Sequence, residues 1–324
     1  MRESALRLRI EEVDRRLLVE DEGLLESIYA VLAVAHYRNS PNDLQLIIEA
    51  PGHRLLVAFV DDAVGGALDA VLEPREGSRG RGVIPDVFVR MGWGDPGPGY
   101  RVVRIAVAPC IQRRGVGSAM LRELERIAAS EGVEWVGASF GHYEPLAFWL
   151  RNGYIPVHVS PRFNPATGEK NIVVIKPLGE KAARLVGVAS CSLLRRLVYS
   201  GSSVFRDMPA EIVALLLKGI PSGCEAPNLS SEQLGRLQLF LHGKLAYESV
   251  HDVLLLGLHI LHSMGAYHEL SEKEIVLLVL LVVQGKPIYE AERLLGLARG
   301  EAEDILRRVY SLLAQPSGDR LNPV

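Results

Sequence analysis

The sequence is short of the features that mark secreted, membrane-spanning and zinc-binding proteins. It has only three cysteines, Cys110, Cys191 and Cys224, with no CxxC pair and no histidine at ligand spacing. We therefore predict no metal site, and the odd count fits a reducing compartment. The longest unbroken apolar run, Ile275 to Val283, is too short to cross a bilayer. The N-terminal stretch MRESALRLRIEEVDRR is charged and unlike a signal peptide. These absences predict a soluble cytoplasmic protein with no membrane partner.

The chain also lacks an excess of basic charge. Its formal net charge is −3 at pH 7, so any surface that binds nucleic acid has to be a local patch. No Walker motif is present, and the glycine turn at Gly115 and Gly117 does not match the GxGxxG dinucleotide motif. The sequence signature of nucleotide hydrolysis is thereby excluded, and this turn is not that of a dinucleotide-binding site.

What is present is a chain long enough for two domains. Its 324 residues, of which 48% are hydrophobic, can fill two cores of ordinary size. Apolar spacing predicts helix over residues 1–50, with a fresh helix start at Ser40–Asp43. A long loop rich in glycine and proline is predicted over residues 74–100. The other expected elements up to residue 175 are strands at about 54–60, 67–72, 101–108, 133–139, 154–159 and 171–175, and helices at 115–130 and 145–151. This alternation predicts an α/β domain with a mixed sheet.

After Pro177 the pattern changes to helices alone. The expected helices are 181–200, 208–218, 230–242, 246–263, 271–284, 288–295 and 300–314. The breaks at Gly285–Pro287 and Gly296–Leu297 give the last three helices a spacing like that of a helix-turn-helix, with a plain helical bundle as the alternative. We expect the histidines of this region to be packing or surface residues and not ligands. They are His242, His251, His259 and His262.

The stretch IQRRGVGSAM, residues 111–120, joins a predicted strand to a predicted helix through a Gly-Val-Gly turn. Such a turn presents unpaired backbone N–H groups at the positive end of the helix dipole, which suits a phosphate. Glycine at positions 115 and 117 lets the backbone approach an oxygen-rich ligand, and Ser118 adds a hydroxyl donor. The alternative is a glycine turn that serves only strand–helix packing.

The spacing Gln112-x-x-Gly115-x-Gly117 resembles the loop that cradles the pyrophosphate of acetyl-CoA in the GNAT acetyltransferase superfamily. The stretches RVVRIAVAP, VGASFG, FWLRNGYIPV and TGEKNIVVIKPL, with AHYRNSPNDLQLIIEAPGH at 35–53, are similar to the RNA cytidine acetyltransferase family, which makes N4-acetylcytidine in tRNA and rRNA. The resemblance implies a GNAT-type mixed sheet flanked by helices over residues 1–178 and an all-helical, RNA-binding domain over 179–324. It also implies acetyl-CoA as cofactor and tRNA or another RNA as partner.

Most members of that family begin with an ATP-binding, helicase-like module, for which this sequence has no motif. We therefore expect a fragment or a short form, which works alone or with a separate ATPase/helicase module. Whether the reaction depends on ATP stays open.

The donor side of the reaction is expected on the strand and turn at residues 104–118. A backbone N–H of the segment Arg104–Val107 is expected to stabilise the oxyanion of the tetrahedral state, and the resemblance implies that this strand lies along the pantetheine arm. The residues expected to bind acetyl-CoA are Ile105, Ala106, Val107, Gln112, Arg113, Arg114, Gly115, Val116, Gly117 and Ser118.

The acceptor side needs a base, because the exocyclic amine of cytosine is a weak nucleophile that must lose a proton as it attacks. His36 is the candidate, since it ends an apolar helix and matches the histidine of the family's AHYRxSP motif. The alternatives are a histidine that only interacts with the helix dipole, and His142 as the base.

Many GNAT enzymes use a tyrosine to protonate the leaving thiol, and in this chain that position is Trp149, four residues before Gly153. A thiol with a pKa of about 8.5 can leave as thiolate without an acid, or Tyr143 or Tyr37 could supply the proton. Phe148 and Trp149 are expected to be core residues.

RNA has to reach this site with its cytidine unpaired or flipped out. The arginines expected to bind its phosphates are Arg38, Arg79, Arg81 and Arg151, with Arg113 and Arg114 facing either the cofactor or the RNA. Two rival functions remain: a protein or small-amine N-acetyltransferase, and an RNA-binding module without turnover.

Overall fold

A computed structural model describes residues 7–34, 52–74 and 82–314. The chain forms two compact units, each described here by itself. One, the sheet unit, comprises residues 1–141, 148–158 and 171–189, and the other, the helical unit, comprises 142–147, 159–170 and 190–324. His36, Arg38, Arg79, Arg81 and the predicted helix start at Ser40–Asp43 lie outside the described residues.

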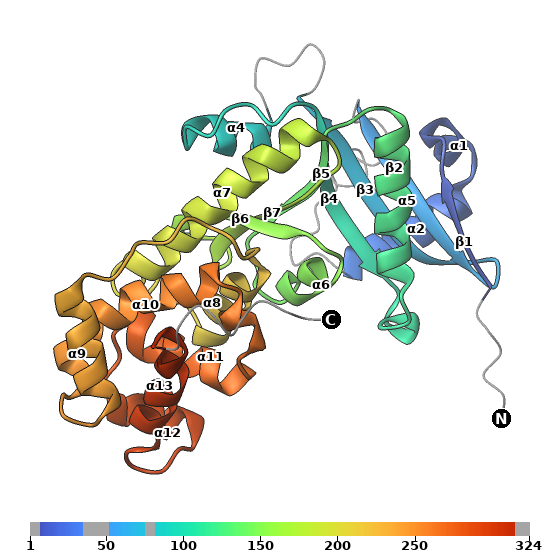
Figure 1. The fold of residues 1–324 in the computed structure, drawn as a ribbon. Helices are drawn as coiled ribbons and strands as arrows, with labels where there is room; N and C mark the ends of the chain where they lie inside the picture. The colour runs from blue at the N-terminus through green and yellow to red at the C-terminus, as the bar shows by residue number, and fades with distance from the viewer. Residues whose placement is uncertain (1–6, 35–51, 75–81, 315–324) are drawn as a thin grey trace, which may run out of the picture. The chain divides into compact units, whose positions relative to one another are not determined.

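A seven-stranded mixed sheet is the main framework of the described chain, as predicted (Figure 1). The strands are β1 (Leu8–Glu12), β2 (His53–Val60), β3 (Ala63–Glu73), β4 (Gly99–Val107), β5 (Trp135–Phe140), β6 (Ile155–Phe163) and β7 (Lys170–Pro177). Their order across the sheet is β1-β2-β3-β4-β5-β7-β6. Strands β4 and β5 run parallel, whereas β1–β2, β2–β3, β3–β4 and β5–β7 are antiparallel pairs.

Helices cover both faces of the strands β2 to β4 (Figure 1). The helices of this part are α1 (Arg15–Glu20), α2 (Glu22–Val34), α4 (Val83–Arg90), α5 (Val116–Ser130) and α6 (Leu146–Arg151), and α7 (Glu180–Tyr199) follows the sheet. Helices α1 and α2 bury Leu18, Ile28 and Leu32 against one face. Helix α5 packs on the opposite face, where a Cβ at Gly66 would lie only 3.0 Å from Cε of Met120.

Two predicted elements are wrong in this unit. Residues 8–12, expected to be helical, form the edge strand β1, because β2 has an open edge that pairs with all five of them. The predicted loop over 74–100 contains helix α4, whose Ile84 and Phe88 lie one turn apart and are fully buried. The surrounding glycines and prolines hide this short amphipathic pattern.

The helical unit follows the predicted helix pattern closely. Its further helices are α8 (Ala210–Gly219), α9 (Ser231–Leu241), α10 (His251–Ser263), α11 (Glu272–Leu278), α12 (Ile288–Leu295) and α13 (Glu301–Tyr310). Ser230 and Ser271 start α9 and α11 with capping boxes that satisfy the first free backbone N–H groups. The apolar run after Glu274 is buried throughout and ends in a π-helical turn, Val279–Val283. Within the described ranges no helix is long and apolar enough to cross a membrane.

The cysteine prediction needs a correction. Cys191 of α7 and Cys224, which follows α8, form a disulfide with a Cα–Cα distance of 5.4 Å, whereas Cys110 is a free, exposed thiol. The odd count conceals this pair, because the two partners are 33 residues apart and nothing in their spacing indicates contact. The bond links α7 to the extended segment before α9.

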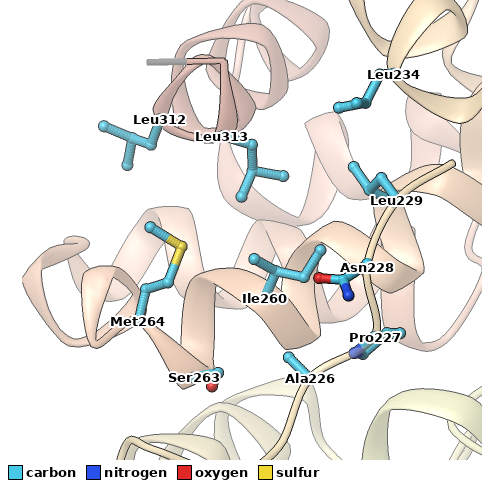
Figure 2. Close-up of a pocket in the computed structure, with 10 residues that line it drawn as sticks. All are labelled: Ala226, Pro227, Asn228, Leu229, Leu234, Ile260, Ser263, Met264, Leu312 and Leu313. Carbon is cyan, nitrogen blue, oxygen red and sulfur yellow. The ribbon is translucent and has the colours of Figure 1, made fainter. Parts of the chain in front are cut away.

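The helical unit also contains an apolar cavity of about 390 Å³. Figure 2 shows side chains such as Leu229, Ile260 and Met264 around it, and none of the ten residues drawn there is titratable. This cavity therefore has no group that could move a proton, and it is not a candidate active site.

Candidate active site

Strands β4 and β5 are paired along only the first part of β4. Their parallel pairing runs only from Gly99 and Trp135 to Val102 and Ala138, although β4 continues to Val107. A register shift in the pairing of β3 with β4 leaves Val103 as an extra residue at the point of divergence. The last part of β4 therefore has no β5 ladder beside it.

The backbone of β4 offers donors to this opening. Ala108 N–H donates to Gly65 O at 2.9 Å, which fixes the alternation of hydrogen bonds between β3 and β4. By that alternation the N–H groups of Ile105 and Val107 point away from β3, and that of Ala106 points toward it. Gln112 Nε2 donates to Val107 O at 3.0 Å, as expected for a carbonyl on the open side.

The N-terminus of α5 follows this strand after a short 3-10 turn, Pro109–Ile111. Gly115 is its N-cap in a left-handed conformation, with φ of 84°, and a glycine has no side chain with which to cap the helix. The first backbone N–H groups, those of Val116, Gly117 and Ser118, are thus directed out of the helix end. Arg113 and Arg114 are exposed beside them. The arrangement suits a phosphate group, because the helix dipole, the free donors and both guanidinium groups favour negative charge.

The two glycines of the turn are required for different reasons. At Gly115 a Cβ would meet no atom of the described residues within 4 Å, but the positive φ strains any other residue. At Gly117 the conformation is helical, and a Cβ would lie 3.3 Å from the ring of Phe148. Gly115 therefore leaves room for a ligand, whereas Gly117 serves packing.

Aromatic side chains gather around Trp149 of α6. Trp149 is buried, stacks on Phe140 with ring centroids 6.3 Å apart, and meets Tyr154 edge-on at 4.8 Å. Trp149 is thus a core residue, as expected. The Tyr154 hydroxyl is also deeply buried, and burial raises its pKa well above the ordinary value.

The remaining predicted residues are placed as follows. Arg151 is exposed at the end of α6. Tyr143, which belongs to the helical unit, is buried, and its hydroxyl accepts a hydrogen bond from Lys170 N–H at 2.9 Å. Burial raises its pKa. His36, Tyr37 and the arginines at 38, 79 and 81 lie outside the described residues.

Sequence reasoning missed a group of buried charges on β3. Asp69 is only 4% exposed and binds both His53 and Arg15, and Glu73 is 2% exposed and binds Arg101 at 2.7 Å. The signal is present in the strand sequence AVGGALDAVLE, where two acidic residues interrupt an otherwise apolar strand. In a sheet covered on both faces, such residues have to be buried.

Sequence comparisons identify proteins that are similar to this chain. The profile of the family described as GNAT acetyltransferase 2 matches residues 27–91 and 126–179. The tRNA(Met) cytidine acetyltransferase TmcA of Aeropyrum pernix is 36% identical over 308 residues, which are 92% of this chain and 43% of that protein. The protein of the same name from Thermofilum pendens is 34% identical, over 93% of this chain and 40% of its own length.

The chain therefore spans less than half the length of the curated relatives it matches. Among solved structures, Ard1 from Thermoplasma volcanium covers 53% of this chain and 99% of its own, at 17% identity and a TM-score of 0.38. The relation in sequence, by contrast, extends through both units. Over most of its own length the chain is therefore similar to the tRNA(Met) cytidine acetyltransferases, and part of it matches the GNAT acetyltransferase 2 family.

Proposed function

We propose that this chain transfers the acetyl group of acetyl-CoA to the exocyclic amine of cytidine in tRNA. The proposal that acetyl-CoA is the donor rests mainly on the N-terminus of α5. This helix follows a strand, β4, whose outward-facing N–H groups lie where the pairing with β5 has ended. The acceptor half is supported by the name of the relatives, tRNA(Met) cytidine acetyltransferases, at 31–36% identity.

On the donor side, the backbone N–H groups of residues 116–118 would hold the pyrophosphate of acetyl-CoA, and Arg113 and Arg114 would neutralise its charge. The open space at Gly115 fits this group, because no Cβ fills the approach to the helix end. The N–H of Ile105 or Val107 would bind the thioester oxygen more tightly as it gains charge, which lowers the barrier to acyl transfer.

On the acceptor side, His36 is proposed as the base that takes a proton from the attacking amine, on the strength of the AHYRNSP sequence. The thiolate leaves without a dedicated acid, since Trp149 occupies the position of the usual tyrosine. The arginines Arg38, Arg79, Arg81 and Arg151 are proposed to contact RNA phosphates.

We propose that residues 1–178 form the catalytic domain and that residues 179–324 dock the RNA. We also propose that the chain works in the cytoplasm, and that a separate ATPase/helicase module can act with it to expose the cytidine.

The test is to incubate the protein with labelled acetyl-CoA and total tRNA, with and without ATP, and to digest the RNA to nucleosides. Labelled N4-acetylcytidine is expected. Label on protein alone would favour the protein acetyltransferase, and RNA binding with no labelled nucleoside under either condition would favour the binding module. A variant His36→Ala should keep its affinity for acetyl-CoA and lose single-turnover rate; an unchanged rate would remove His36 from the reaction.

A further inference from the structure

A buried carboxylate on β3 holds a histidine in one orientation. Oδ1 of Asp69 lies 2.9 Å from Nδ1 of His53, and Oδ2 lies 3.1 Å from the same nitrogen. Arg15 Nη2 donates to Oδ1 at 3.2 Å. An ionised carboxylate only accepts hydrogen bonds, so Nδ1 of His53 donates, and Nε2 is the ring nitrogen that carries the lone pair in the neutral imidazole.

The position of this pair in the sheet connects it with the point where the pairing of β4 and β5 ends. Asp69 is the register partner of Arg104 on β4, next to the extra residue Val103 where β4 leaves β5. Asp69 and His53 lie on the face of the alternating strand residues Leu55, Ala67 and Ala106, which pack against α1 and α2. Helix α5, with the proposed phosphate cradle, packs on the other face.

The two faces of the sheet can therefore serve different parts of the reaction. Helix α5 packs against β4 and β5 on one face, so the face of Asp69 is the one on which an acceptor is sought. On that side the sheet carries ion-paired carboxylates, Asp69 and Glu73, between the apolar cluster under α1 and α2 and a second apolar cluster around Ile84 and Trp135.

A contribution to stability does not by itself explain why the carboxylate of Asp69 is buried. Removing a carboxylate from water costs several kcal/mol, and replacing buried ion pairs by apolar residues is often neutral or stabilising. Glu73 has a local structural task, because its Oε2 accepts Ile84 N–H at 3.0 Å at the start of α4. Among the hydrogen bonds between described residues, Asp69 instead joins two side chains, one of which is an imidazole.

We propose that Asp69 is a positioning residue that fixes His53 as a hydrogen-bond acceptor for the cytosine amine. The amine has two hydrogens: one is lost when the N–C bond forms and the C–S bond breaks, and the other stays in the amide product. His53 Nε2 accepts the hydrogen that stays, which orients the nitrogen lone pair toward the thioester carbon. This inference rests on the proposed function for its substrate, and it assigns the acceptor subsite to the face of α1 and α2.

Binding can be tested without turnover. In the full chain with ¹⁵N-labelled histidine and bound coenzyme A, NMR should show His53 protonated at Nδ1. Cytidine 5′-monophosphate should shift the His53 Nε2 signal, and uridine 5′-monophosphate, which lacks the amine, should not. Equal shifts with both nucleotides, or none with either, would overturn the subsite. A cytidine-specific shift in a protein that acetylates no RNA would contradict the proposed function and leave the subsite standing.

Kinetic measurements on variants distinguish a positioning role of Asp69 from a purely structural one. Asp69→Asn should lower kcat by about 100-fold, because an amide can donate to Nδ1 and thereby place the hydrogen on Nε2, while KM for acetyl-CoA stays unchanged. Glu73→Gln is the matched control: it removes a buried, arginine-paired carboxylate from the same strand and should change kcat by less than about threefold. Combining Asp69→Asn with His53→Ala should be no slower than His53→Ala alone. Equal losses for Asp69→Asn and Glu73→Gln, or additive losses in the double variant, would mean that Asp69 is only structural.

Discussion

Strand β3 of the sheet unit and helix α10 of the helical unit both bury titratable side chains. The carboxylates on β3 form ion pairs, whereas His262 on α10 is neutral. On β3, Asp69 and Glu73 are each paired with an arginine. On α10, His262 donates from Nε2 to Leu217 O at 2.9 Å, and burial lowers its pKa to about 4, so it is neutral at pH 7.

The difference agrees with the proposed location of the active site. Burying a neutral histidine costs less than burying a charge, and it is compatible with a unit that is stabilised by apolar packing and a disulfide. Buried charge is expensive, and β3 maintains it beside the strand that opens toward the proposed donor site. The predictions below compare a position in the sheet unit with one in the helical unit wherever the chain provides a match.

The largest effect is expected at Gly115. Gly115→Glu should abolish measurable acetyl-CoA binding in calorimetry, because the carboxylate would take the place of phosphate at the N-terminus of α5. Gly296→Glu is the matched control: Gly296 also has a positive φ, of 59°, with nothing within 4 Å of its Cβ, but it ends α12 in the helical unit. Undiminished affinity in Gly115→Glu, or equal loss in both variants, would contradict the donor site.

Loss of the disulfide should be the next largest effect. Cys191→Ala with Cys224→Ala opens a loop of 33 residues and should lower the free energy of unfolding by roughly 3–4 kcal/mol. Affinity for acetyl-CoA should stay the same, since both cysteines belong to the helical unit. Chemical denaturation of the double variant against Cys110→Ser provides the comparison, and equal stability of the two would show that the bond does not stabilise the chain.

His262 should make stability depend on pH. Its pKa is lowered from 6.5 to about 4, so protons bind more readily to the unfolded chain between these values. The stabilisation is therefore complete above pH 6.5 and is lost as the pH falls toward 4, by at most roughly 3 kcal/mol. Thermal midpoints measured from pH 7 to 4.5 should fall less steeply in His262→Gln. The same change at the exposed His242 should leave the slope as it is; a wild-type slope in His262→Gln would refute the assignment.

The smallest effects are expected from alanine at two helical glycines. Gly117→Ala brings a Cβ to 3.3 Å from Phe148, so the ring has to shift and the thermal midpoint should fall by a few degrees. Gly235→Ala on α9 meets nothing within 4 Å and should stabilise the helical unit by roughly 0.5–1 kcal/mol. Opposite signs are expected in paired melting curves, and a stabilised Gly117→Ala would exclude a packing role for that glycine.

Periodicity and turn chemistry were sufficient to predict most of the framework. The helix at 116–130 and the strands at 99–107 and 135–140 lie within two residues of their predicted limits. Strand β1 could not be predicted, because an edge strand depends on a partner that is distant in sequence. Helix α4 was missed because its buried face consists of only Ile84, Pro85 and Phe88.

The proposed donor site rests on a local motif, whereas the Asp69–His53 pair does not. The glycine turn and the helix that follows it were predicted from the sequence, and Gly115 is the N-cap of α5; that this turn binds phosphate stays a prediction. Asp69 and His53 are 16 residues apart and meet only through the register of β2 and β3. The disulfide is hidden for the same reason, since long-range pairing leaves no trace in local spacing.

The most direct test of the central claim is nucleoside analysis of tRNA after incubation with acetyl-CoA and either the wild-type chain or Gly115→Glu. The account predicts N4-acetylcytidine with the wild-type chain and none with the variant. Equal amounts of N4-acetylcytidine from both proteins, or none from the wild-type chain with and without ATP, would contradict it.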